Sequence, residues 1–187
     1  PHISGLAAAV LLTLCASAAV ASVDYYCTGD GHSGYLTVNK TGMVVNKYAQ
    51  VTTKISVGDS TIVISSAASF KAKDLIMVHQ STGYSMLSSK IGDQTTIDVS
   101  KSTLGQWELA RIKSVSGSTL TLEEPMVKSF PVTYTQVVSV PEYTNVLVTK
   151  GSSMVAGSWD GKTGGILAFL VQGIIDNRGD ISAHGTG

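Results

Sequence analysis

The chain has 187 residues and a formal net charge of +0, with 6% aromatic and 14% charged residues. This length suits one domain, or one domain with a smaller module inside it. The composition is too apolar for a disordered chain, and the absence of a basic stripe argues against electrostatic nucleic-acid binding. Abundant Gly, Ser, Thr and Val predict a secreted all-β protein, because β-branched residues pack well on pleated sheets.

The N-terminal segment is an uncharged apolar run over residues 3–21 that ends in Ala19-Val20-Ala21. Signal peptidase accepts such a small-x-small end, so we predict that residues 1–21 are a secretory signal peptide cut before Ser22. Three alternatives stay open: a retained transmembrane helix, a lipid anchor on Cys15, and a pilin-like assembly helix. Export predicts a bacterial secreted or cell-surface protein that touches the membrane only through this segment.

The two ends of the sequence predict a fragment of a longer protein. No initiator Met and no basic stretch precede the apolar run, and Gly185-Thr186-Gly187 lies within the C-terminal pattern described below.

Residues 22–42 are a turn-rich N-terminal segment that leads into a first predicted strand at Tyr35–Val38. Cys27, Asp30 and His32 lie close enough in sequence to consider a metal site. Their spacing matches no zinc pattern, and no second pair of ligands follows. We therefore interpret the segment as a surface loop and Cys27 as a lone cysteine without an assigned redox role.

Residues 43–140 are predicted to form a β-barrel-like module. Alternating apolar residues between turns rich in Gly, Ser and Asp are typical of strands that are buried on one face. One or two strands are expected in 43–55, and single strands in 62–64, 75–78, 107–115, 118–122 and 133–140.

A polar, weakly patterned stretch interrupts this module between residues 81 and 105, and we interpret it as a surface excursion with a strand at Thr96–Val99. Ser116-Gly117 is a signal for a tight hairpin. The expected core residues of the module are Phe70, Trp107, Leu109, Ile112 and Val115.

From residue 141 to 187 the pattern changes to short apolar runs, each stopped by a turn rich in Gly, Asn, Asp or Ser. Runs this short indicate strands, not helices. Their regular return predicts the first coils of a β-helix or β-solenoid. The runs are Val146–Val148, Ile166–Leu170, Ile174–Ile175 and Ile181.

Several sequence motifs follow one another between residues 43 and 187. Residues 51–80 resemble G-x-T-x-L-x-V…F-x-x-G-D-x-V-L-V-x-Q, residues 107–122 contain A-R-I-x-S-V-x-G-x-T-L-T-L, and residues 138–149 contain V-x-V-P-x-Y-T-N-V-x-V. The chain continues with W-D-G-K-T-G-G-I-L-A-F from residue 159. In this order the motifs resemble a module of large secreted bacterial surface proteins of the adventurous-gliding-motility type.

This resemblance implies the N-terminal cap region of an exported, cell-surface structural or adhesion-type protein related to gliding. It implies no catalytic residue. The chain departs from the pattern at Lys73, where the family tends to have Gly before the residue corresponding to Asp74, so the conformation of this turn is left open.

Four carboxylates, Glu142, Asp160, Asp176 and Asp180, could bind calcium or form a catalytic pair. Calcium sites in β-solenoids use repeated loops, and glycosidases need two facing carboxylates. The sequence displays neither the repetition nor the spacing. We interpret these residues as exposed turn carboxylates.

The remaining candidate residues have structural interpretations. We interpret Arg178-Gly179-Asp180 as a turn with solubilising charges, although it spells an integrin-type tripeptide. Tyr143, Trp159 and Phe169 are expected in the core or in a stacking ladder, in preference to a sugar platform. The histidines are scattered and lack the context of a nucleophile: His32, His79 and His184.

We therefore predict a fragment without catalysis, with no catalytic, cofactor-binding or metal site assigned and no cofactor. Its expected partners are cell-surface components or polysaccharide, and nucleic acid is not among them. One alternative is the N-terminal part of a secreted β-helix enzyme acting on polysaccharide, whose groove would lie on later coils. Another is a filament subunit that keeps residues 3–21 as an assembly helix.

Overall fold

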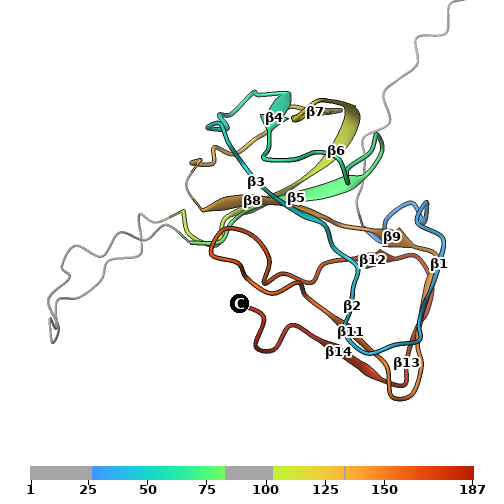
Figure 1. Cartoon of the computed structure of the whole chain (residues 1–187). Helices are drawn as coiled ribbons and strands as arrows, with labels where there is room; N and C mark the ends of the chain where they lie inside the picture. The colour runs from blue at the N-terminus through green and yellow to red at the C-terminus, as the bar shows by residue number, and fades with distance from the viewer. Residues whose placement is uncertain (1–26, 83–102, 133) are drawn as a thin grey trace, which may run out of the picture.

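The computed structural model describes residues 27–82, 103–132 and 134–187, and every regular element in these ranges is a β-strand. The predicted signal peptide at residues 1–21 and the strand expected at Thr96–Val99 lie outside the described residues. No helix in the described ranges has the length and hydropathy needed to span a membrane. The predicted all-β class is confirmed: a small barrel accompanies a set of β-helical coils (Figure 1).

The coils are built from parallel strands that lie along three sides of a triangle (Figure 1). Each strand pairs in register with a strand of a neighbouring coil, as Val146 does with Ile175. The first side contains β1 (Tyr35–Val38), β10 (Asn145–Val148) and β13 (Ile175–Asn177); the second contains β2 (Met43–Val44), β11 (Ser153–Val155) and β14 (Asp180–Ser182); the third contains β9 (Glu142–Tyr143) and β12 (Leu170–Val171).

The interior of the coils is apolar. Along β10, Val146 and Val148 are buried while their neighbours are half-buried, which is the alternation expected of a strand with one face on a core. Val38, Tyr143 and Met154 join them in one hydrophobic cluster. Burial of a single Val side chain contributes about 1.5–3 kcal/mol, so stacking of coils is the main stabilising contribution in this part of the chain.

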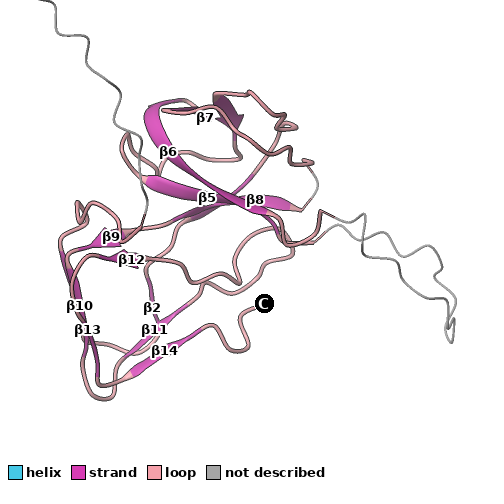
Figure 2. Cartoon of the chain, turned by 180° about the vertical axis from the view of Figure 1, so that it is seen from behind, coloured by secondary structure: helices cyan, strands magenta, loops and turns pink. Residues whose placement is uncertain are grey.

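The first coil begins earlier than the sequence analysis placed it. Residues 22–42 were assigned to a turn-rich segment and residues 43–140 to the barrel, but β1 and β2 pair in parallel with β10 and β11. The barrel is thus an insertion between β2 and β9, and it lies beside the triangle of coils in both views (Figures 1 and 2). An alternating pattern predicts a strand but does not identify a partner that is distant in sequence.

The barrel is a six-stranded antiparallel sheet with the order β3-β8-β5-β6-β7-β4. It curls until Val51, just after β3, pairs with Ile64, just after β4. Phe130 is fully buried inside, and the predicted core position of Phe70 is confirmed. The strands are β3 (Tyr48–Gln50), β4 (Thr61–Val63), β5 (Leu75–Gln80), β6 (Trp107–Ser116), β7 (Thr119–Leu122) and β8 (Thr135–Ser139).

Strand β6 places only part of the predicted residues in the core. Ile112 is fully buried and Val115 packs against the core, but Trp107 is 52% exposed and Leu109 is half-buried. Since Ile112 points inward, the two-residue period puts Trp107 and Leu109 on the outer face. A bulge between Ile112 and Ser114 then shifts the register, so Val115 points inward again.

Side chains from the barrel and from the segment before β3 hold the loop between β11 and β12 by its backbone. This contact shortens the strand predicted at Ile166–Leu170, of which only Leu170 lies in a strand. The backbone groups of this loop bond to side chains where a neighbouring strand would otherwise pair with them. The bonds join Gln136 to Gly164, Tyr48 to Ile166 and Asn46 to Ala168.

Lys73 adopts a φ of 74°, in the left-handed region that favours glycine. A side chain in this region costs about 1 kcal/mol, which agrees with the glycine that the resemblance leads one to expect here.

We predict that Lys73→Gly raises the free energy of unfolding by about 0.5–1 kcal/mol in urea denaturation. Lys71→Gly is the control, because Lys71 is not among the residues with positive φ. It is expected to lower stability, and a Lys73→Gly protein no more stable than wild type would contradict the prediction.

Candidate functional site

A cluster of charged side chains lies where the N-terminal loop, the barrel and the coils meet. Asp30 and His32 come from the loop before β1, Asp74 from the turn before β5, Arg111 from β6 and Glu142 from β9. We call these five residues the junction cluster. Its members come from four separate parts of the chain, so it forms only when the fold is complete.

The centre of the junction cluster is a buried ion pair between Glu142 and Arg111. Arg111 Nη1 donates to Glu142 Oε2 at 2.8 Å, and Nη2 donates to Oε1 at 3.0 Å. Glu142 has 0% exposure and Arg111 has 7%. Glu142 also accepts the backbone N–H of Asp30 at 3.0 Å, and Arg111 donates to the carbonyl of Lys73 at 2.8 Å. These additional bonds are what make burial of two charges tolerable.

Gly29 allows the N-terminal loop to approach this pair. Its φ is +79°, and a Cβ at this position would lie 2.8 Å from Glu142 Cγ. A larger residue would therefore clash with Glu142 and adopt a strained conformation. The glycine is needed for the backbone of Asp30 to reach the carboxylate.

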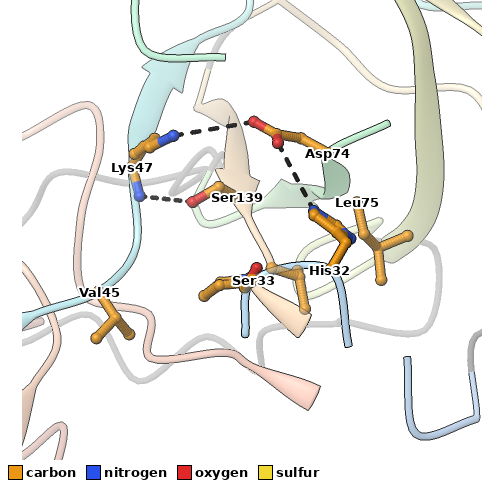
Figure 3. Close-up of a pocket in the computed structure, with 9 residues that line it drawn as sticks. His32, Ser33, Val45, Lys47, Asp74, Leu75 and Ser139 are labelled. Carbon is orange, nitrogen blue, oxygen red and sulfur yellow. Dashed lines mark hydrogen bonds and ion pairs between the residues drawn. The ribbon is translucent and has the colours of Figure 1, made fainter. Parts of the chain in front are cut away.

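His32 lies among three carboxylates of the junction cluster. Its Nδ1 is 2.5 Å from Asp30 Oδ1 and 3.3 Å from Glu142 Oε2, and its Nε2 is 4.0 Å from Asp74 Oδ1. Lys47 Nζ lies 3.9 Å from Asp74 Oδ2 (Figure 3). With a neutral imidazole, the carboxylates of the cluster outnumber the cations Arg111 and Lys47 by one charge.

The pKa of Asp30 lies below its ordinary value of 3.8. Partial burial opposes ionisation of this carboxyl, but hydrogen bonds from the backbone and side chain of His32 outweigh it, and the charge of Arg111 adds to them. Asp30 is therefore a carboxylate at neutral pH and contributes its negative charge to the cluster.

Asp30, His32 and Glu142 each offer a ligand atom within 4.8 Å of the others, so they are a candidate metal group. Glu142 already gives both oxygens to Arg111, whose Nη1 also lies 3.8 Å from Asp30 Oδ2. A divalent ion would sit against this guanidinium, so the arrangement fits an ion-pair network better than a metal centre.

The sequence analysis considered Asp30 and His32 together with Cys27. Cys27 is exposed and does not belong to the candidate group. The residue that joins Asp30 and His32 is Glu142, which lies 112 residues after Asp30. Local spacing could not identify a partner at that separation.

A pocket of about 70 Å³ lies beside the junction cluster, between His32, Lys47, Asp74, Ser139 and Pro141 (Figure 3). The backbone N–H of Lys47 donates to Ser139 Oγ at 2.8 Å across one of its walls. Pockets that hold drug-sized ligands measure roughly 300–1,000 Å³. This space suits water or a small ion.

Of the four carboxylates interpreted as exposed turn residues, only Asp160 lies outside a strand; Glu142, Asp176 and Asp180 belong to β9, β13 and β14. Glu142 contradicts the prediction, because it is completely buried against Arg111. Asp160 is exposed, and backbone N–H groups of Thr163 and Lys162 lower its pKa, as in a polar turn. In the sequence, Glu142 is simply a carboxylate before an apolar residue. That local pattern is the same for an exposed carboxylate and for one that is buried in an ion pair.

The tripeptide Arg178-Gly179-Asp180 connects β13 to β14. Arg178 is paired with Asp176, Nη2 to Oδ2 at 2.5 Å, and this hydrogen bond lowers the pKa of Asp176. Asp180 begins β14 and is exposed. The interpretation as a turn is therefore correct for Arg178 and Gly179, which lie between the two strands, but not for Asp180.

The aromatic candidates occupy two environments. Tyr143 and Phe169 pack together in the core of the coils with ring centroids 6.4 Å apart. Trp159 is half-buried and lines a second pocket together with His79. His184 is exposed near the end of the third coil.

Searches for related proteins identify no matching family model and no matching curated protein. Among solved structures, the chain is similar to three phage tailspikes. The first is the Gp54 tailspike of Acinetobacter baumannii bacteriophage AP22 in complex with A. baumannii capsular saccharide: 11% identity and a TM-score of 0.42 over 79% of this chain and 27% of that one.

The second is the gp61 tailspike of Pseudomonas phage phi297, with 15% identity and a TM-score of 0.39 over 83% of this chain and 24% of that one. The third is the gp49 tailspike of Pseudomonas phage LKA1, with 14% identity and a TM-score of 0.38 over 70% of this chain and 29% of that one. The chain spans about a quarter of the length of these tailspikes. TM-scores this low carry no functional argument for the chain.

Removal of one partner from the central ion pair should be costly. We predict that Arg111→Met lowers the free energy of unfolding by about 3–5 kcal/mol, because Glu142 is left buried without its countercharge. The double variant Arg111→Met/Glu142→Leu should recover most of the loss. Urea denaturation of both variants measures this difference. Arg178→Met, which breaks an exposed pair, is the control and should change stability little. A loss from Arg111→Met no larger than that of the control would contradict the buried-pair account.

The lowered pKa of Asp30 predicts a dependence of stability on pH. Because the folded-state pKa is below the unfolded value of 3.8, the stabilisation is present above pH 3.8 and is lost as the pH falls through the folded pKa. We expect Asp30→Asn to be less stable than wild type at neutral pH, and the difference to shrink with acidification below 3.8. Chemical denaturation across this range measures it. A difference that is independent of pH would show that the charge of Asp30 is not responsible.

Proposed function

We propose that the chain is the N-terminal cap region of an exported, cell-surface structural or adhesion-type protein: the start of a β-solenoid with a barrel branching from its first coil. Its partners are cell-surface components or polysaccharide. The fragment itself is proposed to have no catalytic activity.

The edge of the last coil is the observation that carries this proposal. Among the strands of the described residues, β13 pairs only with β10, and β14 pairs only with β11. At this edge Ile174 is 70% exposed and Ile175 is 48% exposed. A strand edge with exposed apolar residues is a template for another strand, and repeat proteins bury such faces by stacking the next repeat. This supports a chain that continues its coils as a longer solenoid.

The attachment of the barrel supports a structural role. The barrel leaves the first coil after β2 and returns at β9, and the junction cluster lies at the return point. Three side chains of this region also hold the loop of the second coil by its backbone. Many bonds between the two parts fix their relative position, as a rigid scaffold requires.

The proposal of a fragment without catalysis is supported by the state of the candidate carboxylates in the described residues. Glu142, the buried one, uses both oxygens in the pair with Arg111. A general acid or base must be free to contact a substrate. The resemblance to adventurous-gliding-motility-type surface proteins supports the same role and is the basis for linking it to gliding.

Cell-surface exposure is the test of the proposed function. Antibodies raised against the full chain should label intact cells of the source bacterium without permeabilisation, and a gene that lacks residues 1–21 should lose the label. An antibody against a cytoplasmic protein is the control for cell integrity. Labelling only after permeabilisation would contradict the proposal. Release of reducing sugar from surface polysaccharides by the purified chain would contradict its non-catalytic part.

A further inference from the structure

A second pocket lies between the barrel and the coils and shares no residue with the one beside the junction cluster. Its volume is about 240 Å³. The end of the β5 segment contributes His79, Ser81 and Thr82, and the loop between β11 and β12 contributes Trp159 and residues 164–166. Gly187 completes the lining. This size is somewhat below the roughly 300–1,000 Å³ of drug-sized sites and suits a single ring.

One wall of this pocket is backbone that the fold holds in place. Gly164 has a φ of +107° and Gly165 a φ of +72°, and a Cβ at Gly164 would overlap the carbonyl oxygen of Ser158. Gln136, fully buried, binds Gly164 by two hydrogen bonds of 2.9 Å, one to its carbonyl and one from its N–H. The wall is therefore both free of side chains and fixed before any ligand binds.

The polar groups of the pocket form a hydrogen-bonded chain. Gln136 Nε2 donates to Ser81 Oγ at 2.7 Å, and Ser81 Oγ lies 3.0 Å from His79 Nδ1. Burial lowers the pKa of His79, which favours the neutral ring at neutral pH. Ser81 Oγ can donate to Nδ1 or accept from it, so Nε2 is a donor in one tautomer and an acceptor in the other. Nε2 can bond a hydroxyl group in both tautomers, because a hydroxyl group both donates and accepts.

Thr82 lines the pocket without offering its hydroxyl. Its Oγ1 is shielded from solvent, so a ligand in the pocket does not reach it.

The chemistry of the lining selects the class of ligand. Trp159 is an aromatic side chain whose face can pack on apolar C–H groups. The other side chains that line the pocket are His79, Ser81, Thr82 and Ile166, and none of them is an acid, a lysine or an arginine. A phosphate or a uronate would therefore lack a countercharge. A ring with one apolar face and several hydroxyl groups, which is an uncharged pyranose, matches both the aromatic and the polar groups.

We propose that this pocket, formed by Trp159, His79 and Thr82 against the Gly164-Gly165 backbone, binds one uncharged pyranose unit of a glycan. The inference rests on the proposed surface function, which supplies polysaccharide as a partner, and it deepens that function by naming the site and the ligand class. Trp159 packs on the sugar ring, and His79 Nε2 bonds one of its hydroxyls.

Proton–nitrogen correlation spectra of the ¹⁵N-labelled full chain test the proposal. The chain has 2 tryptophans, Trp107 and Trp159, so substitution of either one assigns both indole signals. The probes are the methyl glycosides of glucose, galactose and N-acetylglucosamine, with glucuronate as the charged comparison. We expect at least one uncharged glycoside at millimolar concentration to shift the Trp159 signal and leave the Trp107 signal in place.

Variants separate binding from folding. Trp159→Ala and His79→Phe should each weaken the affinity for the glycoside by about tenfold, with His79→Phe keeping an aromatic ring at this position. Trp107→Ala is the matched control and should bind as wild type, because Trp107 lies outside the pocket against Lys128.

Three outcomes would overturn the proposal: no glycoside shifts the Trp159 signal, both tryptophans shift alike, or the folded His79→Phe protein binds as wild type. A shift with p-cresol but not with any glycoside would also overturn it and would identify an apolar peptide side chain as the occupant.

Surface labelling of intact cells remains the separate test of the underlying function. Labelled cells with no sugar binding would reject only the pocket assignment, and unlabelled cells would reject the surface role whether or not sugar binds.

Discussion

The buried pair of Glu142 and Arg111 is the interaction on which the arrangement of this molecule depends. It joins the first strand of the second coil to the barrel, and the N-terminal loop closes over it through the amide of Asp30. Two charges without solvent are tolerated only with complete bonding. The pair therefore favours one relative position of loop, barrel and coils, whereas apolar packing alone would tolerate small shifts.

Polar side chains continue this role away from the junction cluster. Asn46, Tyr48 and Gln136 bind backbone groups of the second-coil loop that would otherwise pair with a strand. Such bonds are directional, so they fix the loop at defined points. The same bonds hold the glycine wall of the larger pocket, which links the rigidity of the scaffold to the site proposed for a sugar ring.

A barrel that branches beside a solenoid leaves the coil edges accessible. The coils gain stability from apolar side chains stacked along their interior, and the exposed Ile175 of the last coil pairs in register with the interior residue Val146. A surface scaffold needs length from the coils and contact surfaces from its branches. The proposed functions of the two parts follow from this division.

The sequence by itself determined the class of the fold and most strand positions, because alternating apolar residues and Gly-rich turns act over a few neighbours. Phe70 in the core and the strand at Tyr35–Val38 follow from such local patterns. Only the tertiary structure decided that Tyr35–Val38 belongs to the first coil, that a bulge turns Val115 inward while Trp107 stays on the outer face, and that Glu142 is buried beside Arg111. Each of these depends on a partner in another strand, often far along the chain, and a two-residue period carries no information about which strand that is.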